Sequence, residues 1–430
     1  TCALPILKKI QPNMLKGIVS VPPSKSVAHR AIIAASLSGG ECTIENVAVS
    51  KDIEATIECM RALGAKCSVN TKSMTVSVTK KKTYKVKNMI TLDCGESGST
   101  LRFLMPIALG KGVPVKFVGH GRLMQRPQTP YLNIFREKGI KYELGTDYII
   151  IDGSLKSGSY GLPGNVSSQF ITGLLFALPI IDGDSEIIVS GELESKGYVD
   201  LTIDMLSKFG IEIENYKYKL FKIKGGQKYK GCNELKIEAD YSQAAFFLVA
   251  DAIGCNVECL NLNSNSLQGD REILDIIKNT GARIVKGPNG GIMAKKTAVM
   301  HGITVDAKNI PDLVPIVAVL CSFCSGESRI INAGRLRHKE SDRLRSTATE
   351  LGRLGVDIVE ERDGLKIIGR DLVEGNVCSS WNDHRIAMAL SIAACRAEGC
   401  IEITGAEKAV TKSYPDFYKV YDRLAGNETY

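Results

Sequence analysis

A pattern of apolar and polar positions recurs along the chain at a nearly constant spacing. In each copy a helix-like segment ends in an apolar residue, a glycine follows, and strand-like positions come next, as in Phe209-Gly210-Ile211-Glu212-Ile213. The glycines are separated by 75, 71, 71, 74 and 71 residues, and they are Gly64, Gly139, Gly210, Gly281, Gly355 and Gly426. Glycine is typical after the last helical turn because it adopts the left-handed conformation without a Cβ penalty. The pattern therefore predicts six copies of one element.

Each period also opens with capping residues that precede an apolar helix pattern. These helix starts are Ser24, Ser97, Ser167, Asp240, Pro311 and Asn382. A turn with glycine and a strand follow each helix, as in Gly40-Glu41-Cys42-Thr43-Ile44. A unit of about 71 residues is too long for a solenoid repeat, so each copy is a small α/β module. Six modules in 430 residues predict two pseudo-symmetric domains of three.

The composition is that of an ordinary globular protein, with 44% hydrophobic and 24% charged residues. No stretch approaches the roughly 18 uninterrupted apolar residues of a membrane span. The first residues, Thr1-Cys2-Ala3-Leu4-Pro5, lack the basic and apolar regions of a signal peptide. The thirteen cysteines have no framework spacing, which favours reduced thiols. We therefore expect a cytoplasmic protein that neither enters a membrane nor is secreted.

Two local features have ordinary structural interpretations. Cys321-Ser322-Phe323-Cys324 has CxxC spacing, but it lies in an apolar run without a second pair, so core packing is favoured over metal or redox chemistry. The run Lys80-Lys81-Lys82 stands between strand-like segments and is interpreted as a solvated turn. The net charge of +8 is mild and suits anionic substrates.

The helix starts carry cations where capping residues alone would suffice. Unpaired N–H groups make a helix N-terminus an anion site, and Lys25, Arg30, Arg102 and Arg385 add positive charge at four of these starts. Four such cations at equivalent points of a repeat are expected to converge on a polyanion. Among the acidic residues, Asp312 follows Pro311 as an N-cap would, and Glu340 lies in a segment typical of an exposed turn.

Several other kinds of site are excluded by missing motifs. Ser24-Lys25-Ser26 resembles the end of a P-loop, but Pro22-Pro23 stands where the glycines belong. There is no GxGxxG and no GxSxG, and the five histidines lack metal-ligand spacing. Aromatic content of 6% is poor for base stacking. We therefore expect no cofactor, no metal and no nucleic-acid partner.

Taken together, the polar segments closely resemble the EPSP synthase family of enolpyruvyl transferases. The resemblance rests on Pro23–Arg30, Ser97–Arg102, Gln125–Pro130, Ser167–Gln169, Ser195–Asp200, Pro311–Pro315, Lys339–Leu344, Asn382–Met388 and Lys412–Asp416. It implies an inside-out α/β barrel in two domains, each of three βαβαββ repeats, with the helix N-termini at an interdomain cleft that closes on substrates. It also implies one continuous domain, 20–238, and a discontinuous one, 1–19 plus 239–430.

The resemblance further implies an activity in the shikimate pathway toward chorismate and aromatic amino acids. The carboxyvinyl group of phosphoenolpyruvate would move to the 5-hydroxyl of shikimate 3-phosphate, with release of phosphate, and the enzyme would act as a monomer without a cofactor. Asp312 would be the base, and Glu340 with Lys25 the acid–base pair. The implied ligands of shikimate 3-phosphate are Lys25, Ser26, Arg30, Ser167, Ser168, Gln169, Ser195, Tyr198, Asp312 and Lys339. Those of phosphoenolpyruvate are Lys25, Gly98, Arg126, Gln169, Arg343, Arg385 and Lys412.

The sequence departs from the family pattern at three positions. Glu96 and Arg335 each replace a frequent Asn, and Ser99 replaces Thr with its hydroxyl retained. A carboxylate near phosphoenolpyruvate should be paired, so a Glu96–Arg335 ion pair is predicted.

Two rival functions remain as alternatives. A related enolpyruvyl transferase acts on UDP-N-acetylglucosamine, but that family carries a reactive Cys in the loop that is Gly119–Pro127 here, and this loop has none. A sixfold clamp on nucleic acid would need an exposed basic face, whereas the cations here stand beside Asp312 and Glu340.

Overall fold

The computed structural model describes residues 7–79 and 88–426, so the Lys80-Lys81-Lys82 run lies outside the described residues. The chain divides into two compact units. The continuous unit is Pro23–Glu238, and the two-segment unit comprises the described residues up to Pro22 and from Ala239 onward. The chain therefore crosses between units at Pro22/Pro23 and at Glu238/Ala239, whereas the predicted crossings were 19/20 and 238/239.

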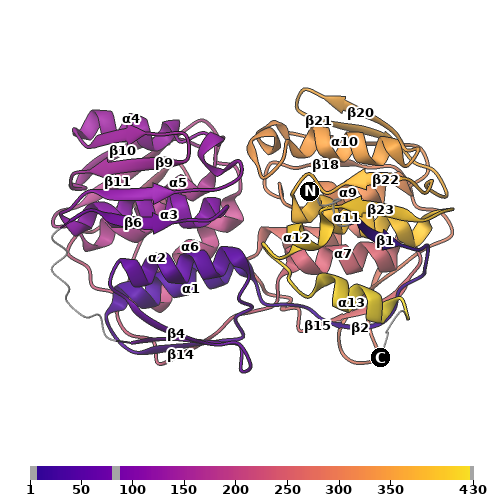
Figure 1. Cartoon of the computed structure of the whole chain (residues 1–430), viewed down its shortest axis with the longest axis horizontal. Helices are drawn as coiled ribbons and strands as arrows, with labels where there is room; N and C mark the ends of the chain where they lie inside the picture. Colours follow the sequence, from indigo (N-terminus) through magenta and orange to yellow (C-terminus); the bar gives the residue numbers. More distant parts are fainter. Residues whose placement is uncertain (1–6, 80–87, 427–430) are drawn as a thin grey trace, which may run out of the picture. The chain divides into compact units, whose positions relative to one another are not determined.

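The continuous unit contains three four-stranded sheets in its described residues (Figure 1). Their strand orders are β14(Glu234–Lys236)-β3(Cys42–Glu45)-β5(Thr75–Thr79)-β4(Lys66–Asn70), β6(Ile90–Asp93)-β7(Val115–Val118)-β9(Tyr148–Asp152)-β8(Lys141–Leu144), and β10(Gly158–Pro163)-β11(Ser185–Ser190)-β13(Leu220–Ile223)-β12(Glu214–Tyr216). Its helices are α1(Lys25–Ser38), α2(Lys51–Ala62), α3(Gly98–Ala108), α4(Thr129–Lys138), α5(Ser168–Ala177) and α6(Lys196–Lys208).

The two-segment unit repeats this plan. Its sheets are β16(Arg283–Lys286)-β17(Ile292–Lys295)-β15(Asn256–Leu260)-β2(Lys16–Ser20), β18(Thr304–Asp306)-β19(Glu327–Ile331)-β21(Gly364–Ile368)-β20(Asp357–Glu361), and the three-stranded β1(Leu7–Ile10)-β23(Ile401–Thr404)-β22(Val377–Ser379). Its helices are α7(Tyr241–Ala252), α8(Ile273–Asn279), α9(Val314–Ser322), α10(Arg343–Arg353), α11(His384–Ala393), α12(Ala406–Val410) and α13(Phe417–Leu424).

All six sheets pair their strands in the same parallel and antiparallel order, which confirms the predicted repeat. In each, a parallel pair such as β6 and β7 is extended by an antiparallel strand such as β9. Five sheets add a second antiparallel strand, as β8 does beside β9. In five modules the helix-ending glycine stands before the edge strand, and all six predicted glycines have positive φ, from 69° to 97°. In these five modules the left-handed turn sends the chain from the helix into the edge strand, whereas Gly426 is the last residue that the structure describes.

The first strands of two modules are exchanged along the chain. β2 precedes α1 in sequence, yet it pairs in parallel with β15 in the two-segment unit. β14 precedes α7, yet it pairs in parallel with β3 in the continuous unit. The sixth module is completed from the opposite end of the chain, because β1 pairs with β23. Sequence periodicity found the modules, but it did not reveal this exchange.

Two kinds of helix build the cores. Every residue of α7, α9 and α11 is buried, and these three helices pack against one another. A helix that is apolar on all sides is stable only inside the protein, where sheets and other helices cover it. α10 and α13 instead have one apolar stripe and cover the outside.

Candidate functional site

In the continuous unit, the predicted ligands at the start of α1 are joined to α6 by one arginine. The buried Arg30 donates from Nη1 to the Ser26 carbonyl at 2.7 Å and from Nη2 to the Tyr198 carbonyl at 2.9 Å. Its Nε donates to Thr202 Oγ1 at 2.8 Å. Burial lowers the pKa of Arg30 to about 10, so the group is still charged at neutral pH. The structure thus brings Ser26, Arg30 and Tyr198 together.

Lys25 and Ser195 lie at the starts of the same two helices. Lys25 Nζ forms an ion pair with Asp52 Oδ2 at 2.8 Å, a partner that no sequence motif indicated. Ser195 precedes α6 with a left-handed φ of 59°. A non-glycine residue in that region is strained, and such strain is concentrated at functional sites.

The starts of α3 and α5 and the loop before α4 form a second polar group. A Cβ on Gly98 would lie 2.8 Å from Arg126 Nη1 and 3.5 Å from Gln169 Oε1, so only glycine allows this approach. Arg102 Nη1 donates to Gln169 Oε1 at 2.7 Å, and Gln169 Nε2 donates to Ser99 Oγ at 3.0 Å. Arg102 therefore supports Gln169 from inside the protein.

The serines before α5 act as the N-terminal cap. Ser167 Oγ accepts a hydrogen bond from the Gln169 main-chain N at 3.3 Å, and Ser168 is buried. The predicted ligands Gly98, Arg126, Ser167, Ser168 and Gln169 thus lie around two neighbouring helix starts, since α3 packs against α5.

In the two-segment unit, Asp312 lies among three cations. Its carboxylate accepts from Arg343 Nη1 at 2.8 Å and from Arg385 Nη2 at 3.0 Å, and Lys339 Nζ lies 3.5 Å away. Burial alone would raise the pKa of Asp312, but Arg385, Lys339 and Arg343 together hold this pKa well below its ordinary value. The carboxylate is therefore ionised and tightly held.

Two interpretations from the sequence are wrong at this point. Asp312 is not the N-cap of its helix, because α9 begins at Val314 and Leu313 occupies the cap position. The segment around Glu340 is not a solvated turn, because the side chain of Arg343 is only 1% exposed and its Nη2 donates to Glu340 Oε2 at 2.7 Å. Local sequence could not show the first result, since the partners of Asp312 come from α10 and α11, whereas the partner of Glu340 is only three residues along the chain.

Arg343 is held by a carboxylate that sequence reasoning missed. Its Nε donates to Asp383 Oδ2 at 2.9 Å, and Asp383 also caps α11 by accepting from the Arg385 main-chain N at 3.0 Å. Asp383 therefore orients both arginines. Burial, with help from the charges of Arg343 and Arg335, lowers the pKa of Lys339 to about 8. Lys412 Nζ donates to the Asn382 carbonyl at 2.6 Å beside them.

Glu96 and Arg335 lie in different units. Arg335 Nη2 donates to the carbonyl of Lys308. The Glu96–Arg335 ion pair stays a prediction.

The two cysteines of the CxxC segment are buried and reduced, as core packing predicts. Burial raises the pKa of the Cys321 thiol to about 12, so no reactive thiolate forms there. Within residues 7–79 and 88–426, no group of three or more His, Cys, Asp or Glu side chains could hold a metal ion. None of the described helices is long and apolar enough to span a membrane.

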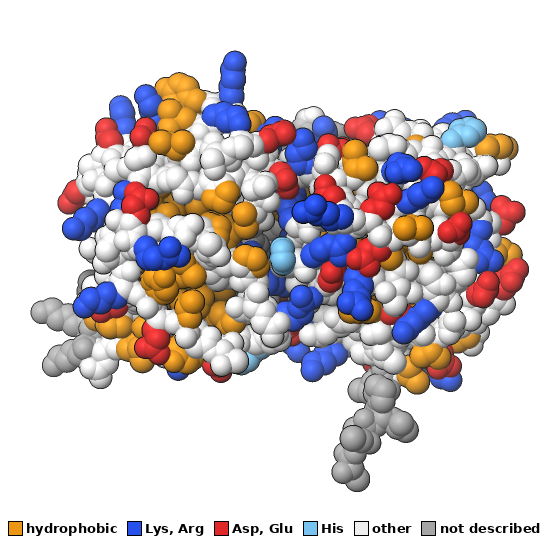
Figure 2. Space-filling view, turned by 90° about the horizontal axis from the view of Figure 1, so that it is seen from above, with side chains coloured by type: hydrophobic (Ala, Val, Ile, Leu, Met, Phe, Trp, Pro, Cys, Tyr) orange, Lys and Arg blue, Asp and Glu red, His pale blue; other side chains and the backbone are white. Residues whose placement is uncertain are grey.

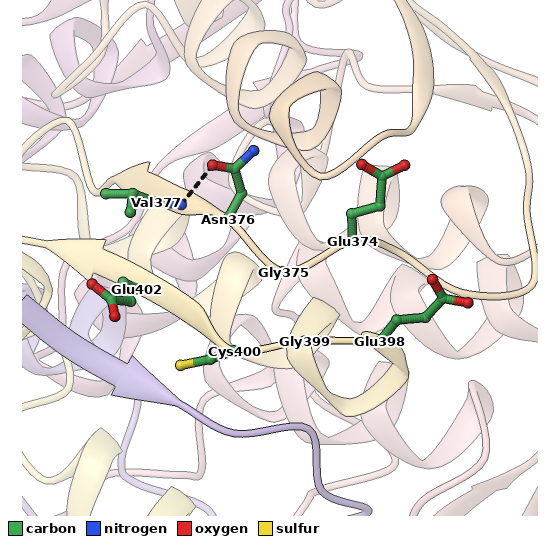
Figure 3. Close-up of a pocket in the computed structure, with 8 residues that line it drawn as sticks. All are labelled: Glu374, Gly375, Asn376, Val377, Glu398, Gly399, Cys400 and Glu402. Atoms are coloured by element: carbon green, nitrogen blue, oxygen red, sulfur yellow. Dashed lines mark hydrogen bonds between the residues drawn. The ribbon is translucent and has the colours of Figure 1, made fainter.

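A pocket of about 390 Å³ in the two-segment unit is acidic, in contrast to the cationic helix starts (Figure 3). It is lined by Glu374, Gly375, Asn376, Val377, Glu398, Gly399, Cys400 and Glu402. With three carboxylates and no cationic side chain among these eight residues, it would repel a polyanion. This pocket is therefore a poor candidate for an anion site.

Comparison with known proteins identifies the family. Residues 10–421 match the family model for EPSP synthase (3-phosphoshikimate 1-carboxyvinyltransferase). A 3-phosphoshikimate 1-carboxyvinyltransferase of Clostridium novyi is 50% identical over 427 residues, which cover 97% of each chain. A solved EPSP synthase of Acinetobacter baumannii is 26% identical with a TM-score of 0.79, over 97% of this chain and 98% of that one. An enolpyruvyl transferase of Streptomyces tendae, 16% identical with a TM-score of 0.77 over 98% and 97% of the two chains, shares the fold. The chain therefore belongs to the EPSP synthase family.

Proposed function

We propose that this chain transfers the carboxyvinyl group of phosphoenolpyruvate to the 5-hydroxyl of shikimate 3-phosphate and releases phosphate. Membership of the family supports this reaction. The observation that carries it is Asp312, an ionised carboxylate between two buried guanidinium groups that are themselves suited to an anionic substrate. A base and an anion site so close together suit the attack of a hydroxyl on phosphoenolpyruvate.

The predicted ligands divide between the two substrates. For shikimate 3-phosphate we propose Lys25, Ser26, Arg30, Ser167, Ser168, Gln169, Ser195, Tyr198, Asp312 and Lys339. For phosphoenolpyruvate we propose Lys25, Gly98, Arg126, Gln169, Arg343, Arg385 and Lys412. The proposed reaction therefore uses residues of both units, and the planar fork of arginine fits carboxylate and phosphate groups.

Asp312 takes the 5-hydroxyl proton while the hydroxyl oxygen bonds to C2 of phosphoenolpyruvate. Glu340, with Lys25, supplies a proton to the methylene carbon, and a tetrahedral intermediate results. Phosphate then leaves C2, and the new methyl group returns a proton, which restores the vinyl double bond. Each proton needs a positioned donor or acceptor, which contributes about 10²–10⁴-fold to the rate.

Electrostatics give Asp312 a reason to become a better base when substrate binds. In the absence of substrate, Arg343 and Arg385 stabilise its charged form. An anion that takes hydrogen bonds from these guanidinium groups weakens that stabilisation, so the pKa of Asp312 rises toward the range of a general base. The base is thereby activated only when phosphoenolpyruvate is present.

The test is phosphate release from phosphoenolpyruvate without added metal, with either shikimate 3-phosphate or UDP-N-acetylglucosamine as acceptor. Release with the first acceptor alone is expected. Release only with UDP-N-acetylglucosamine would leave the fold assignment intact and contradict shikimate 3-phosphate as the acceptor. No phosphate release with either acceptor would overturn the transferase proposal.

A nucleic-acid function is not favoured. On the face shown in Figure 2, Lys and Arg side chains are interspersed with Asp and Glu. A phosphate backbone binds best to a surface of one sign, and such binding weakens steeply with salt. A salt titration with labelled DNA should therefore show weak binding at most.

We also propose that the enzyme works as a monomer in the cytoplasm. The described cysteines are all free thiols, which favours a reducing compartment. Sedimentation at micromolar concentration should give a mass near 46.6 kDa.

A further inference from the structure

The loop between β22 and α11 contains two consecutive strained residues. Trp381 and Asn382 both have a φ of 52°, in the left-handed region that non-glycine residues rarely adopt. Such a residue costs about 1–3 kcal/mol and persists only where its surroundings determine it. The pair directly precedes Asp383 and α11, so something in the fold must hold it.

Glu350 on α10 holds this loop from the inside. Its side chain is 1% exposed. Its Oε1 accepts from the indole Nε1 of Trp381 at 2.6 Å, and its Oε2 accepts from the Ser379 main-chain N at 3.0 Å. Arg353 Nη1 lies 3.2 Å from the same carboxylate. The buried charge is thus satisfied by three donors: Trp381 belongs to the strained pair, and Ser379 ends β22 just before the loop.

The loop in turn contacts two groups proposed for phosphoenolpyruvate. The Asn382 carbonyl accepts from Lys412 Nζ at 2.6 Å. Asp383, the next residue, accepts from Arg343 Nε at 2.9 Å. A shift of the Trp381–Asn382 pair would therefore displace the acceptor of Lys412 and the carboxylate that orients Arg343.

We propose that Glu350 is a positioning residue for phosphoenolpyruvate, acting through Trp381 and Ser379 on Lys412 and Arg343. This inference rests on the proposed function. Glu350 touches no residue proposed for either substrate, so its effect is indirect. Most groups proposed for shikimate 3-phosphate lie in the continuous unit and are not joined to Glu350 by this chain of contacts.

The test is Glu350→Gln with steady-state kinetics in both substrates. Glutamine has one acceptor oxygen, so it can keep only one of the N–H donors of Trp381 and Ser379 and turns an amide N–H toward the other. Hydrogen bonds to a charged group of this kind are worth roughly a 10- to 100-fold change in an equilibrium. We expect kcat/KM for phosphoenolpyruvate to fall by about that factor, with the KM for shikimate 3-phosphate changed less than about twofold.

The only tryptophan of the chain gives a second readout. The emission of Trp381 should change in Glu350→Gln, because its indole partner is altered. The matched control is Glu374→Gln, an exposed glutamate of the same unit, which should leave both the kinetics and the emission unchanged. If Glu350→Gln gives no cooperative unfolding transition, Trp381→Phe tests the proposal in its place, because it keeps an aromatic ring and removes the N–H donor.

The outcomes separate the two proposals. Wild-type protein that releases no phosphate would overturn the proposed function and, with it, this inference. Active wild-type protein whose Glu350→Gln variant loses affinity equally for both substrates, or for neither, would overturn this inference alone. For Trp381→Phe, a selective rise in the KM for phosphoenolpyruvate supports the positioning role, and an unchanged KM overturns it.

Discussion

Arg385 binds Asp312 at two points. Its Nη2 donates to the carboxylate Oδ2 at 3.0 Å, and its Nη1 donates to the main-chain carbonyl of the same residue at 3.0 Å. The arginine therefore holds both the carboxylate of Asp312 and the main chain of the same residue in place. Since Arg343 holds the other carboxylate oxygen at 2.8 Å, the direction of the Asp312 side chain is set from α10 and α11 together.

Asp312→Asn should still bind both substrates but lose turnover. The amide has nearly the same shape, yet it cannot take a proton, so kcat should fall by about 10²–10⁴-fold. Initial rates of phosphate release and calorimetric binding of each substrate check this. Asp275→Asn, at an exposed helix position of the same unit, is the matched control. Undiminished kcat in Asp312→Asn would contradict the role of the base.

Arg343→Lys should destabilise the fold as well as the site. The guanidinium of Arg343 serves three carboxylates, those of Asp312, Glu340 and Asp383, and an ammonium group cannot reach all three. Asp383 would remain buried with its ionic partner lost, which costs about 3–5 kcal/mol in the free energy of unfolding. Urea unfolding measures this loss.

The partly exposed arginine Arg329 offers a comparison for that measurement. Its side chain is 43% exposed, so Arg329→Lys should change the stability by less than about 0.5 kcal/mol. Equal effects of the two substitutions would mean that the buried network adds no more to the free energy of unfolding than a surface ion pair does.

Activity should fall on the alkaline side because of Lys339. Burial lowers its pKa to about 8, and only the charged ammonium attracts the anionic substrate. In the free enzyme this charge is present below pH 8 and lost above it, so kcat/KM for shikimate 3-phosphate should fall about tenfold per pH unit beyond that point. In Lys339→Arg the guanidinium stays charged, so this alkaline decline should disappear whatever the absolute rate. An identical decline in both proteins would assign it to another group.

Thr56→Val should loosen the starts of two helices in the continuous unit. Thr56 Oγ1 lies 2.7 Å from His29 Nδ1 and 2.6 Å from Thr100 Oγ1, and Thr100 Oγ1 donates to Ser97 Oγ at 2.8 Å. Burial, with help from Lys25 and Arg30, lowers the pKa of His29 well below its usual value, so this chain of hydrogen bonds is neutral. Valine keeps the shape and leaves buried polar atoms unsatisfied, for a loss of about 1–3 kcal/mol in urea unfolding.

Thr91→Val on β6 is the control for this experiment, because Thr91 is exposed. If both valine variants unfold at the same urea concentration as the wild type, the hydrogen-bond chain does not stabilise the helix starts.

Much of the fold could be predicted from the sequence because it depends on interactions between residues that are close along the chain. The six glycines were found by their spacing, and all six have the left-handed φ that a helix end requires. The helix starts at Ser24, Ser97, Ser167 and Asp240 are the observed N-caps, since a capping side chain acts on its own next turn.

The site was legible only in part. The motifs named Arg343 and Arg385, but nothing local indicated that Asp383 orients them both or that Asp52 pairs with Lys25. The same acidic residue types cap many helices, so Asp312 looked like a cap until its partners from α10 and α11 were seen.

The sequence by itself determined the module, its six copies and the residues at each helix start, because turns, caps and hydrophobic periodicity act over a few neighbouring residues. Only the tertiary structure decided that β2 and β14 exchange sheets, that β1 completes the last module, and that Glu350 holds the loop at Trp381. These are contacts between distant segments, and they are chosen by burial and by hydrogen-bond satisfaction in the whole packed unit.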